Sequence, residues 1–598
     1  MIGILSGILL NNPVYKEHMG KFLRQVIFPE LNSPQDHLRA RACWLLHHFS
    51  DAEYESEGRL SEAFRLIVLC LLRDKEPPVK VEAAIAMEML LTSQGKSTKK
   101  FLQPQIREIV LELLKLLKVT ENEELTNVVR KIVCTFTDEI APLAVEICEN
   151  LVSTFLQVLE DPDSGEGKSM TAMGLMNTMR CTLDVMQRRP NVYRALELVI
   201  LKAVRYVFTD CVSELYEDAI GLCCALTEWQ ISQEMWKVLQ IIYDLFQREG
   251  IDYFSEMMPL LYNYVTVDTK TFLSSSHFLE CMFNMIQMVL EFDQSVNFSE
   301  NTECLAIKLL EVIILQCKGM DLDGMISTFI TTIIQRMKRD MESSKAKVMC
   351  IQVIIAALYY NPTIFLNTMD KLHIPKRSVF AYVLSQWFNS IDYFLGVHSR
   401  KMCVIGLAHL IQMSDNPSVV SYAQHIVPSA LKIFQGLKRE DAVQNGKENI
   451  EREDANKDND EQLMIESEDE LEDEQNSKNG TKAADNPVNV SGTMSLDDDI
   501  DTDEEEANLE AFITPLDNSG VMDEFSLFKQ VLEGIKCSNP AWYTRLTENL
   551  SEIQMKTLSE VVSSVKIKTD ARDSKEKFKF EKSERSHNVP GYPRNIGM

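Results

Sequence analysis

The sequence has few of the features that nucleic-acid-binding, secreted or membrane proteins need. Basic residues are the minority, with 61 Lys and Arg against 89 Asp and Glu, and the formal net charge is −28. Direct nucleic-acid binding depends on Lys and Arg that neutralise phosphates, so this balance argues against it. The sequence also has no signal segment and no apolar run of about 18 residues, and it therefore predicts no membrane association.

Cysteines are present, but not in the patterns typical of disulfide frameworks or metal sites. None of the 14 cysteines forms a CxxC pair. Cys43, Cys70, Cys134, Cys350 and Cys403 are scattered within apolar helical runs, which is typical of reduced core residues. We therefore expect a soluble protein in a reducing compartment.

Catalytic motifs are missing as well. No HExxH, G-x-S-x-G or kinase loop set occurs in the sequence. The segment Gly165–Ser169 ends like a phosphate-binding loop, but Pro162 occupies the position of the first required Gly and no strand precedes it, which favours a polar inter-helix loop. His47 and His48 lie near Cys43 and offer at most two metal ligands, which favours a packed helix. We expect no catalytic residue, no metal and no cofactor. Catalysis stays open as an alternative function.

The most unusual feature that is present is a local block of acid. Between Glu440 and Glu510 there are 26 acidic and 5 basic residues, a net charge of −21 within the chain's −28. Such a block with few aromatics cannot bury enough apolar surface to become ordered, so we predict a disordered insert over residues 439–508. The residues expected to attract a basic partner are Glu468, Asp469, Glu470, Glu472, Asp473, Glu474, Asp497, Asp498, Asp499, Asp501, Asp503, Glu504, Glu505 and Glu506.

Two interpretations of this insert remain open. It could be a solubilising loop, or a flexible polyanion that competes with nucleic acid for basic proteins or guards a binding face. Ser467, Ser495 and Thr502 each have an acidic residue three positions later, the pattern that acid-directed kinases favour.

Helical periodicity dominates up to about Lys438, and alternating strand patterns are nearly absent. The segment Leu38–Trp44 after Pro34 and the segment Val79–Ala84 after Pro77-Pro78 repeat at a spacing of 41 residues, and a further helix opens near Leu125. Periods of about 40 to 47 residues with two helices per unit are typical of HEAT and armadillo arrays. In such a unit Pro begins the second helix, and small Ala residues let neighbouring backbones approach.

These patterns predict an all-α, right-handed superhelical solenoid of HEAT repeats over residues 1–438, followed by the insert. A C-terminal helical repeat is expected at 509–565, and a disordered polar tail with interleaved Lys and Phe at 566–598, either a solvated end or a docking peptide. The apolar residues Ile2, Ile4, Leu5, Ile8 and Leu9 are expected to be exposed at one end of the solenoid.

Seven segments also resemble one known family, the importin-7 and importin-8 type of nuclear transport receptor within the importin-β superfamily, and the likeness to importin-8 is the stronger. The segments are Leu38 to Trp44 (LRARACW), Pro78 to Ala84 (PVKVEAA), Met257 to Asp268 (MMPLLYNYVTVD), Lys308 to Gly319 (KLLEVIILQCKG), Met349 to Pro362 (MCIQVIIAALYYNP), Gly396 to Gly406 (GVHSRKMCVIG) and Leu509 to Asp517 (LEAFITPLD).

The resemblance implies a receptor that binds basic import cargo, such as ribosomal or histone-like proteins, in the cytoplasm. It also implies passage through nuclear pores by contact with FG-repeat nucleoporins, shuttling between cytoplasm and nucleus, and release of cargo by Ran-GTP. Family members are longer, and their N-terminal Ran-GTP site has no counterpart in this sequence, so we expect no independent control by Ran. The alternative is a HEAT scaffold or chaperone-like adaptor that holds basic proteins without Ran-driven transport.

Overall fold

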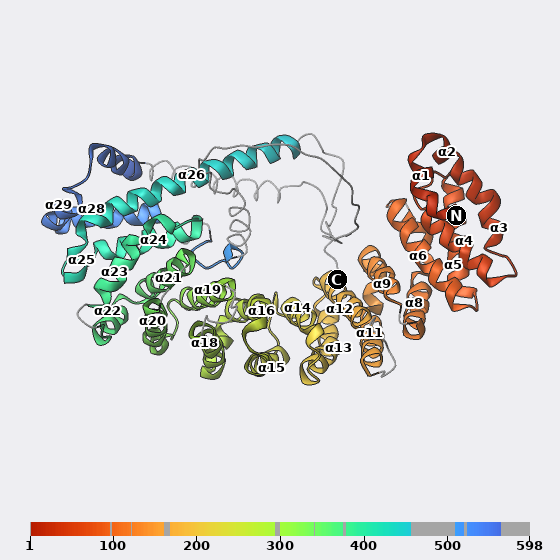
Figure 1. Ribbon diagram of the computed structural model, residues 1–598, viewed down its shortest axis with the longest axis horizontal. Helices are drawn as coiled ribbons and strands as arrows, with labels where there is room; N and C mark the ends of the chain where they lie inside the picture. The colour runs from red at the N-terminus through yellow and green to blue at the C-terminus, as the bar shows by residue number, and fades with distance from the viewer. Residues whose placement is uncertain are drawn as a thin grey trace, which may run out of the picture. The chain divides into compact units, whose positions relative to one another are not determined.

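The computed structural model describes residues 2–563 except 55, 96–97, 121, 161–167, 293–299, 340, 342, 375–377, 456–508 and 519–522. Every regular element within this described part is a helix (Figure 1). The chain divides into two compact units, Met1–Met285 and Ile286–Met598. Each unit is a stack of helices, as the all-α repeat prediction required.

The first unit begins with short helices and continues as regular helix pairs. Its α-helices are α1 (Ser6–Asn11), α2 (Pro13–Phe22), α3 (Phe28–Glu30), α4 (Asp36–His48), α5 (Glu57–Arg73), α6 (Pro77–Ser93), α7 (Lys99–Leu102), α8 (Ile106–Thr120), α9 (Glu123–Thr135), α10 (Thr137–Ile140), α11 (Ala144–Glu160), α12 (Lys168–Met186), α13 (Pro190–Thr209), α14 (Tyr216–Thr227), α15 (Gln233–Glu249), α16 (Phe254–Thr266), α17 (Thr269–Ser274) and most of α18 (Ser276–Glu291).

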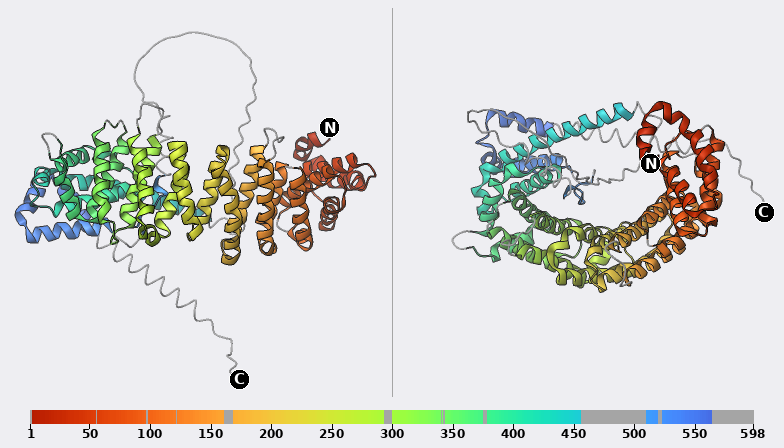
Figure 2. Two further views of the ribbon diagram at one scale, coloured as in Figure 1. Left: turned by 90° about the horizontal axis from the view of Figure 1, so that it is seen from below. Right: turned by 45° about the vertical axis from the view of Figure 1, so that its right-hand side comes forward.

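Two layers build this unit. Helices α4, α6, α9, α12, α14 and α16 contact one another in that order, and α5, α8, α11 and α13 form the parallel series behind them. Successive helices lie side by side in both views of Figure 2. The contacts of α4 with α6 and of α6 with α9 confirm the repeat that the 41-residue spacing predicted.

The junction between the first repeats shows how an Asp ends one helix and a Pro begins the next. Asp74 ends α5, where its carboxylate accepts hydrogen bonds from the backbone N–H groups of Lys75 and Glu76, and Pro77 begins α6. The same carboxylate accepts two hydrogen bonds from the guanidinium of Arg39 in α4, at 2.6 and 3.0 Å. This bidentate pair joins the turn of one repeat to the helix of the preceding one.

The second unit continues the same architecture. Its helices are α19 (Glu300–Gln316), α20 (Asp323–Lys338), α21 (Ser344–Tyr360), α22 (Pro362–Lys371), α23 (Val379–Asn389), α24 (Val397–Ile411), α25 (Pro417–Ser421), α26 (Ala423–Ala455), α28 (Glu524–Ser538), α29 (Pro540–Thr547) and a helix over residues 552–563. One layer is the series α19, α21, α24 and α26, here called the α24 layer, and the other is α20, α22, α23 and α25.

In the C-terminal repeat that we expected at 509–565, residues 509–518 form no long helix, and the helices from α28 (Glu524–Ser538) onward pack against the preceding ones. The ring centroids of Phe525 and Phe528 in α28 lie 4.5 and 5.2 Å from that of Phe434 in α26. Trp542 in α29 donates its indole N–H to the carbonyl oxygen of Ile411 at 2.9 Å. The chain therefore returns to the α24 layer after the insert.

Some expectations fall on residues that the structure does not describe. The polar tail from 566 onward lies outside the described residues, as does most of the predicted insert, 456–508. Helix α26 extends to Ala455, so the backbone of residues 439–455, which we assigned to the insert, is helical. Of the apolar N-terminal residues, Ile2, Ile4, Leu5 and Ile8 are exposed.

The cysteines correct one expectation. All 14 are free thiols, and Cys43, Cys70, Cys350 and Cys403 are buried as predicted, but Cys134 is exposed. Cys134 lies in the last turn of α9. The apolar residues around it face the core, whereas its own side chain is exposed.

One stretch of the described residues, Thr137–Glu160, is long and apolar enough by composition to cross a membrane, but half of its most apolar window is buried. It contains α11, whose residues Ile147, Leu151 and Phe155 are fully buried among neighbouring helices. We interpret it as a core helix of the first unit.

Candidate docking site

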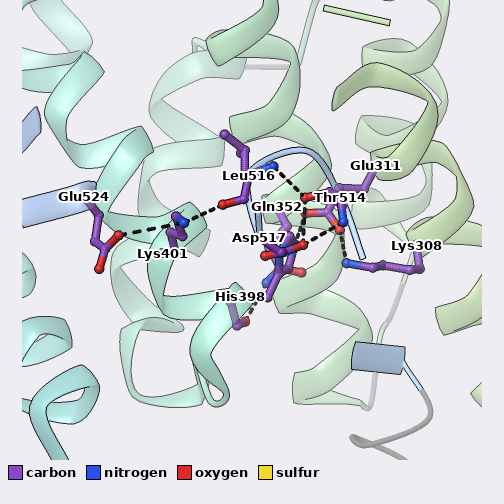
Figure 3. A network of polar contacts seen from close by, with 10 residues as sticks. Lys308, Glu311, Gln352, His398, Lys401, Thr514, Leu516, Asp517 and Glu524 are labelled. Carbon is purple, nitrogen blue, oxygen red and sulfur yellow. Dashed lines mark hydrogen bonds and ion pairs between the residues drawn. The ribbon is translucent and has the colours of Figure 1, made fainter. Parts of the chain in front are cut away.

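The segment that follows the insert lies across the α24 layer. Residues 509–518, here called the strap, form no long helix and cross the helices α19, α21 and α24 (Figure 3). Leu509 and Leu516 of the strap are buried with exposed fractions of 7% and 2%, whereas Ile513 is 53% exposed. Two buried leucines therefore hold a segment whose other residues, apolar and polar, are partly open to solvent.

The imidazole of His398, in the first turn of α24, joins the strap to α19. Its Nδ1 lies 2.6 Å from Oδ1 of Asp517 in the strap, and its Nε2 lies 3.1 Å from Oε1 of Glu311. The other oxygen of Glu311 accepts a hydrogen bond of 2.9 Å from the ammonium of Lys308, which lies one turn earlier in α19. Figure 3 shows these side chains converging beneath the strap.

This geometry specifies the protonation of the ring. Ionised carboxylates only accept hydrogen bonds, so a ring between two of them must donate from both nitrogens and is therefore an imidazolium. Lys308 and His398 then balance Glu311 and Asp517. Because the side chain of Glu311 is only 1% exposed and that of Lys308 only 5%, this balance of charge is what makes their burial tolerable.

The pKa values of the network agree with this assignment. Burial alone raises the pKa of Glu311, but attraction to Lys308 and His398 outweighs it and lowers the pKa to about 2. Burial and Lys308 oppose the charge on His398, yet Glu311 and the hydrogen bond to Asp517 leave its pKa above the ordinary value. Burial likewise raises the pKa of Asp517, and the hydrogen bond and charge of His398 more than reverse this effect.

Further contacts shape the strap itself. Oδ2 of Asp517 accepts hydrogen bonds from the backbone N–H and the hydroxyl of Thr514, at 2.7 and 2.8 Å, which closes a tight turn. Lys401 in α24 donates to the carbonyl oxygen of Leu516 and lies 3.9 Å from a carboxylate oxygen of Glu524. Asp517 therefore acts both as the turn residue of the strap and as its ionic anchor.

Glycine is favoured where α24 begins. Gly396, the residue before α24, has φ +73°, and a Cβ there would lie 2.4 Å from Oε1 of Glu510 in the strap. The left-handed backbone disfavours a side chain at this position, whereas the Glu510 carboxylate, at the end of a flexible side chain, can move aside.

A cavity of about 660 Å³ opens between the strap and the helices. Its lining mixes apolar side chains with a few charged ones: Glu300, Lys345, Val348, Met349, Gln352, Leu395, Glu510, Phe512 and Ile513 are among them. In the network described above, the Thr514 hydroxyl donates a hydrogen bond to the Asp517 carboxylate and so closes the turn of the strap. The arrangement holds a segment in place and presents a groove, which suits docking.

The predicted acidic residues, from Glu468 to Glu506, all lie outside the described residues, so their placement stays a prediction. The structure describes the two segments from which the acidic stretch emerges: α26, which ends at Ala455, and the strap. No pattern in the sequence indicated the network around His398. The segments Gly396–Gly406 and Leu509–Asp517 were both noted for their resemblance, but no local signal pairs residues 119 positions apart.

The weaker motifs have structural explanations. Lys168, the lysine of the phosphate-loop-like segment, donates to the carbonyl oxygen of Leu159 at 2.6 Å, and residues 161–167 lie outside the described part. His48 packs against Trp44, with ring centroids 3.8 Å apart, as the packed-helix interpretation expected. Among the described residues, no group of three or more His, Cys, Asp or Glu is placed to hold a metal ion.

The family model and two related sequences that match this chain are those of importins. A family model described as importin-11-like, TPR repeats, matches residues 173–491. Importin-8 of Homo sapiens is 38% identical over 588 residues, which cover 97% of this chain and 56% of that protein. A probable importin-7 homolog of Dictyostelium discoideum is 29% identical over 71% of this chain and 40% of its own length.

Among solved structures, the exportin Cse1 in its cargo-free, cytoplasmic state has a TM-score of 0.52 at 14% identity, over 91% of this chain and 51% of that one. At this identity the likeness supports the helical-repeat fold alone. The chain spans about half the length of the curated relatives it matches.

Proposed function

Because the chain belongs to the importin family, we propose that it is a cargo-binding part of a nuclear import receptor, which carries basic proteins through the nuclear pore in a Ran-dependent cycle. On this proposal it shuttles between cytoplasm and nucleus, is transiently at the nuclear envelope, and has no enzymatic activity of its own. Its other partners would be FG-repeat nucleoporins and, through the complete receptor cycle, Ran-GTP.

One observation carries the proposal for basic cargo: the acidic stretch leaves the solenoid and returns to it within the same layer. It follows α26, a member of the α24 layer, and it ends at the strap, which is anchored on α19 and α24 through His398. Residues 456–508, with 19 acidic and 3 basic residues, are therefore tethered at both ends to one series of helices. Electrostatic complementarity of this kind accelerates encounter with a positively charged partner more than it raises affinity.

The test replaces residues 456–508 with a neutral Gly/Ser linker of equal length, which keeps α26 and the strap intact. Association of a histone-like protein with the two chains is then followed by biolayer interferometry over a series of salt concentrations. Because exposed charges are screened over about 8 to 10 Å at physiological salt, we expect slower association and a flatter salt dependence for the replaced chain. An acidic protein of similar size is the control, and equal association rates and salt slopes for both chains would overturn the proposal.

A second measurement separates the receptor from the scaffold alternative. The basic cargo bound to the purified chain is challenged with excess Ran-GTP. Ligand-driven release requires an effector that binds the cargo-free form more tightly. Release would show that a Ran-GTP site lies within this chain and would overturn the scaffold alternative, whereas retention agrees with the expectation that this chain alone is not controlled by Ran.

A further inference from the structure

Two thiols face each other between neighbouring repeats of the first unit. Cys134 lies at the end of α9, and Cys181 lies in α12, the next helix of the same layer. Cys134 is exposed and Cys181 is partly buried. Each thiol lies close enough to the other to shift its pKa, and the Cys181 thiol donates to Oδ1 of Asn177 at 3.8 Å.

The packing of α9 against α12 independently supports this register. A Cβ on Gly174 of α12 would lie 2.6 Å from Oγ1 of Thr126 in α9, and Oγ1 of Thr178 lies 3.4 Å from the carbonyl oxygen of Thr126. Cys134 follows Thr126 by eight residues and Cys181 follows Gly174 by seven, so both lie about two helical turns further along. The close approach at Gly174 therefore places both cysteines at the same level of the contact between α9 and α12.

The surroundings of Cys134 favour its thiolate. The neighbouring Cys181 thiol and the charges of Arg130 and Lys131 together lower the pKa of Cys134 to about 7, against the opposing effects of burial and Asp184. Cys134 is also the more exposed of the two sulfurs, so it is the one that an oxidant reaches first.

Reagents can reach this pair. Cys134 lines a surface depression of about 290 Å³, together with Lys99, Gln103, Asp138 and Glu139. A second pair of thiols that shift each other's pKa, Cys43 and Cys70, is buried, with exposed fractions of 0% and 6%. The two pairs therefore differ in access rather than in pairing.

We propose that Cys134 and Cys181 form an oxidant-sensitive dithiol site that closes reversibly to a disulfide between consecutive repeats and that binds dithiol-directed ligands such as trivalent arsenicals. With a hydroperoxide as oxidant, the Cys134 thiolate attacks the terminal oxygen. The O–O bond breaks, an S–O bond forms, and the leaving alkoxide or hydroxide takes up a proton. The Cys181 thiol then loses its proton and attacks the sulfenic sulfur, the S–S bond forms, and water leaves.

Closure would have a mechanical consequence. Repeats of a solenoid contact only their neighbours, so its flexing is distributed over the joints between them. A covalent bond between α9 and α12 would fix one of these joints. Thioredoxin-like or glutathione-type thiols would reopen it by exchange.

The experiment uses the full reduced chain treated with hydrogen peroxide, blocked with N-ethylmaleimide, digested and analysed by mass spectrometry. We expect a linked peptide pair containing Cys134 and Cys181, with the mass loss of about 2 Da that two hydrogens require. Phenylarsine oxide given before the peroxide should prevent the link. Cys134→Ser should abolish it, and Cys181→Ala should abolish it and send Cys134 on to the sulfinic acid.

Matched controls are available in the same chain. Cys211→Ser and Cys537→Ser replace two other exposed thiols and should form the link as the unmodified chain does. Far-ultraviolet circular dichroism checks that each variant is folded. Oxidation of Cys134 to the sulfinic acid in the unmodified chain without any link to Cys181, or oxidation of Cys211 and Cys537 while Cys134 stays reduced, would overturn the proposal.

Discussion

Nδ1 of His398 lies 2.6 Å from an oxygen of Asp517, a residue 119 positions later in the chain. This contact attaches the end of the acidic stretch to the solenoid. Only Leu509 and Leu516 give the strap deeply buried apolar anchors, so its attachment depends strongly on the ion pair between His398 and Asp517 and on the hydrogen bond from Lys401 to the Leu516 carbonyl oxygen. Segments held by few buried contacts open at a lower free energy than the core.

Asp517→Asn should loosen the strap without unfolding the solenoid. The substitution removes the charge partner of the His398 ring, and losing a charge-assisted hydrogen bond of this kind costs about 1 to 3 kcal/mol. Amide hydrogen exchange in residues 509–518 should accelerate by roughly 5- to 150-fold, because 1.4 kcal/mol corresponds to a factor of ten. Asp392→Asn is the control, since Asp392 pairs with Lys432 at an exposed site. Unchanged exchange in the strap of Asp517→Asn would show that the ion pair does not hold it.

Attachment of the strap should weaken as the pH rises above about 6.5. The folded pKa of His398 is raised, so its contribution is complete below the ordinary value of 6.5 and is lost as the pH rises through the higher folded value. The carboxylates act in the opposite direction: their contribution is present above their ordinary values of 4.5 for Glu311 and 3.8 for Asp517 and is lost on acidification. The attachment should therefore be firmest between about pH 4.5 and 6.5.

Hydrogen exchange between pH 6 and pH 9, corrected for the intrinsic rates, measures this effect. His398→Gln should remove the pH dependence of the strap. A strap that is better protected at pH 9 than at pH 6 in the unmodified chain would contradict the assignment of an imidazolium.

The helical repeat could be predicted from the sequence but the strap could not, and the reason is physical. Helix pairs are specified by residues close together, such as Asp74 and Pro77 at one turn and the alanines of α6, so their pattern can be recognised locally. The fold class, the last helical pair and the family likeness were therefore predictable. The contact between His398 and Asp517 depends on how far the chain travels before it returns, and no local pattern encodes that distance. The exposure of Cys134 was missed because it depends on side-chain direction within an apolar helix rather than on the run itself.

Gly406→Ala should destabilise the second unit. A Cβ at Gly406 in α24 would lie 2.4 and 2.8 Å from ring atoms of Trp387 and 3.0 Å from Ile355, so the tightly packed junction of α21, α23 and α24 would have to expand. Overpacking of this kind costs about 1 to 3 kcal/mol. The matched control is Gly534→Ala in α28, where a Cβ meets nothing within 4 Å and helix propensity predicts a gain of about 0.5 to 1 kcal/mol. Urea unfolding of both variants should give shifts of opposite sign, and a stabilised Gly406→Ala would disprove the close packing.

Phosphorylation of the acidic stretch should strengthen its proposed attraction for basic cargo, a prediction that rests on the sequence because its sites lie outside the described residues. Replacing Ser467, Ser495 and Thr502 with Asp changes the net charge of the stretch from −21 to −24. Because these charges are screened over about 8 to 10 Å and act mainly during encounter, we expect only a modest gain, on the order of twofold, seen in the association rate rather than in dissociation. Replacing the same three residues with Ala keeps the charge and should leave the kinetics unchanged. Weaker binding of the Asp variant to a histone-like protein would contradict the proposed attraction and favour a solubilising role for the stretch.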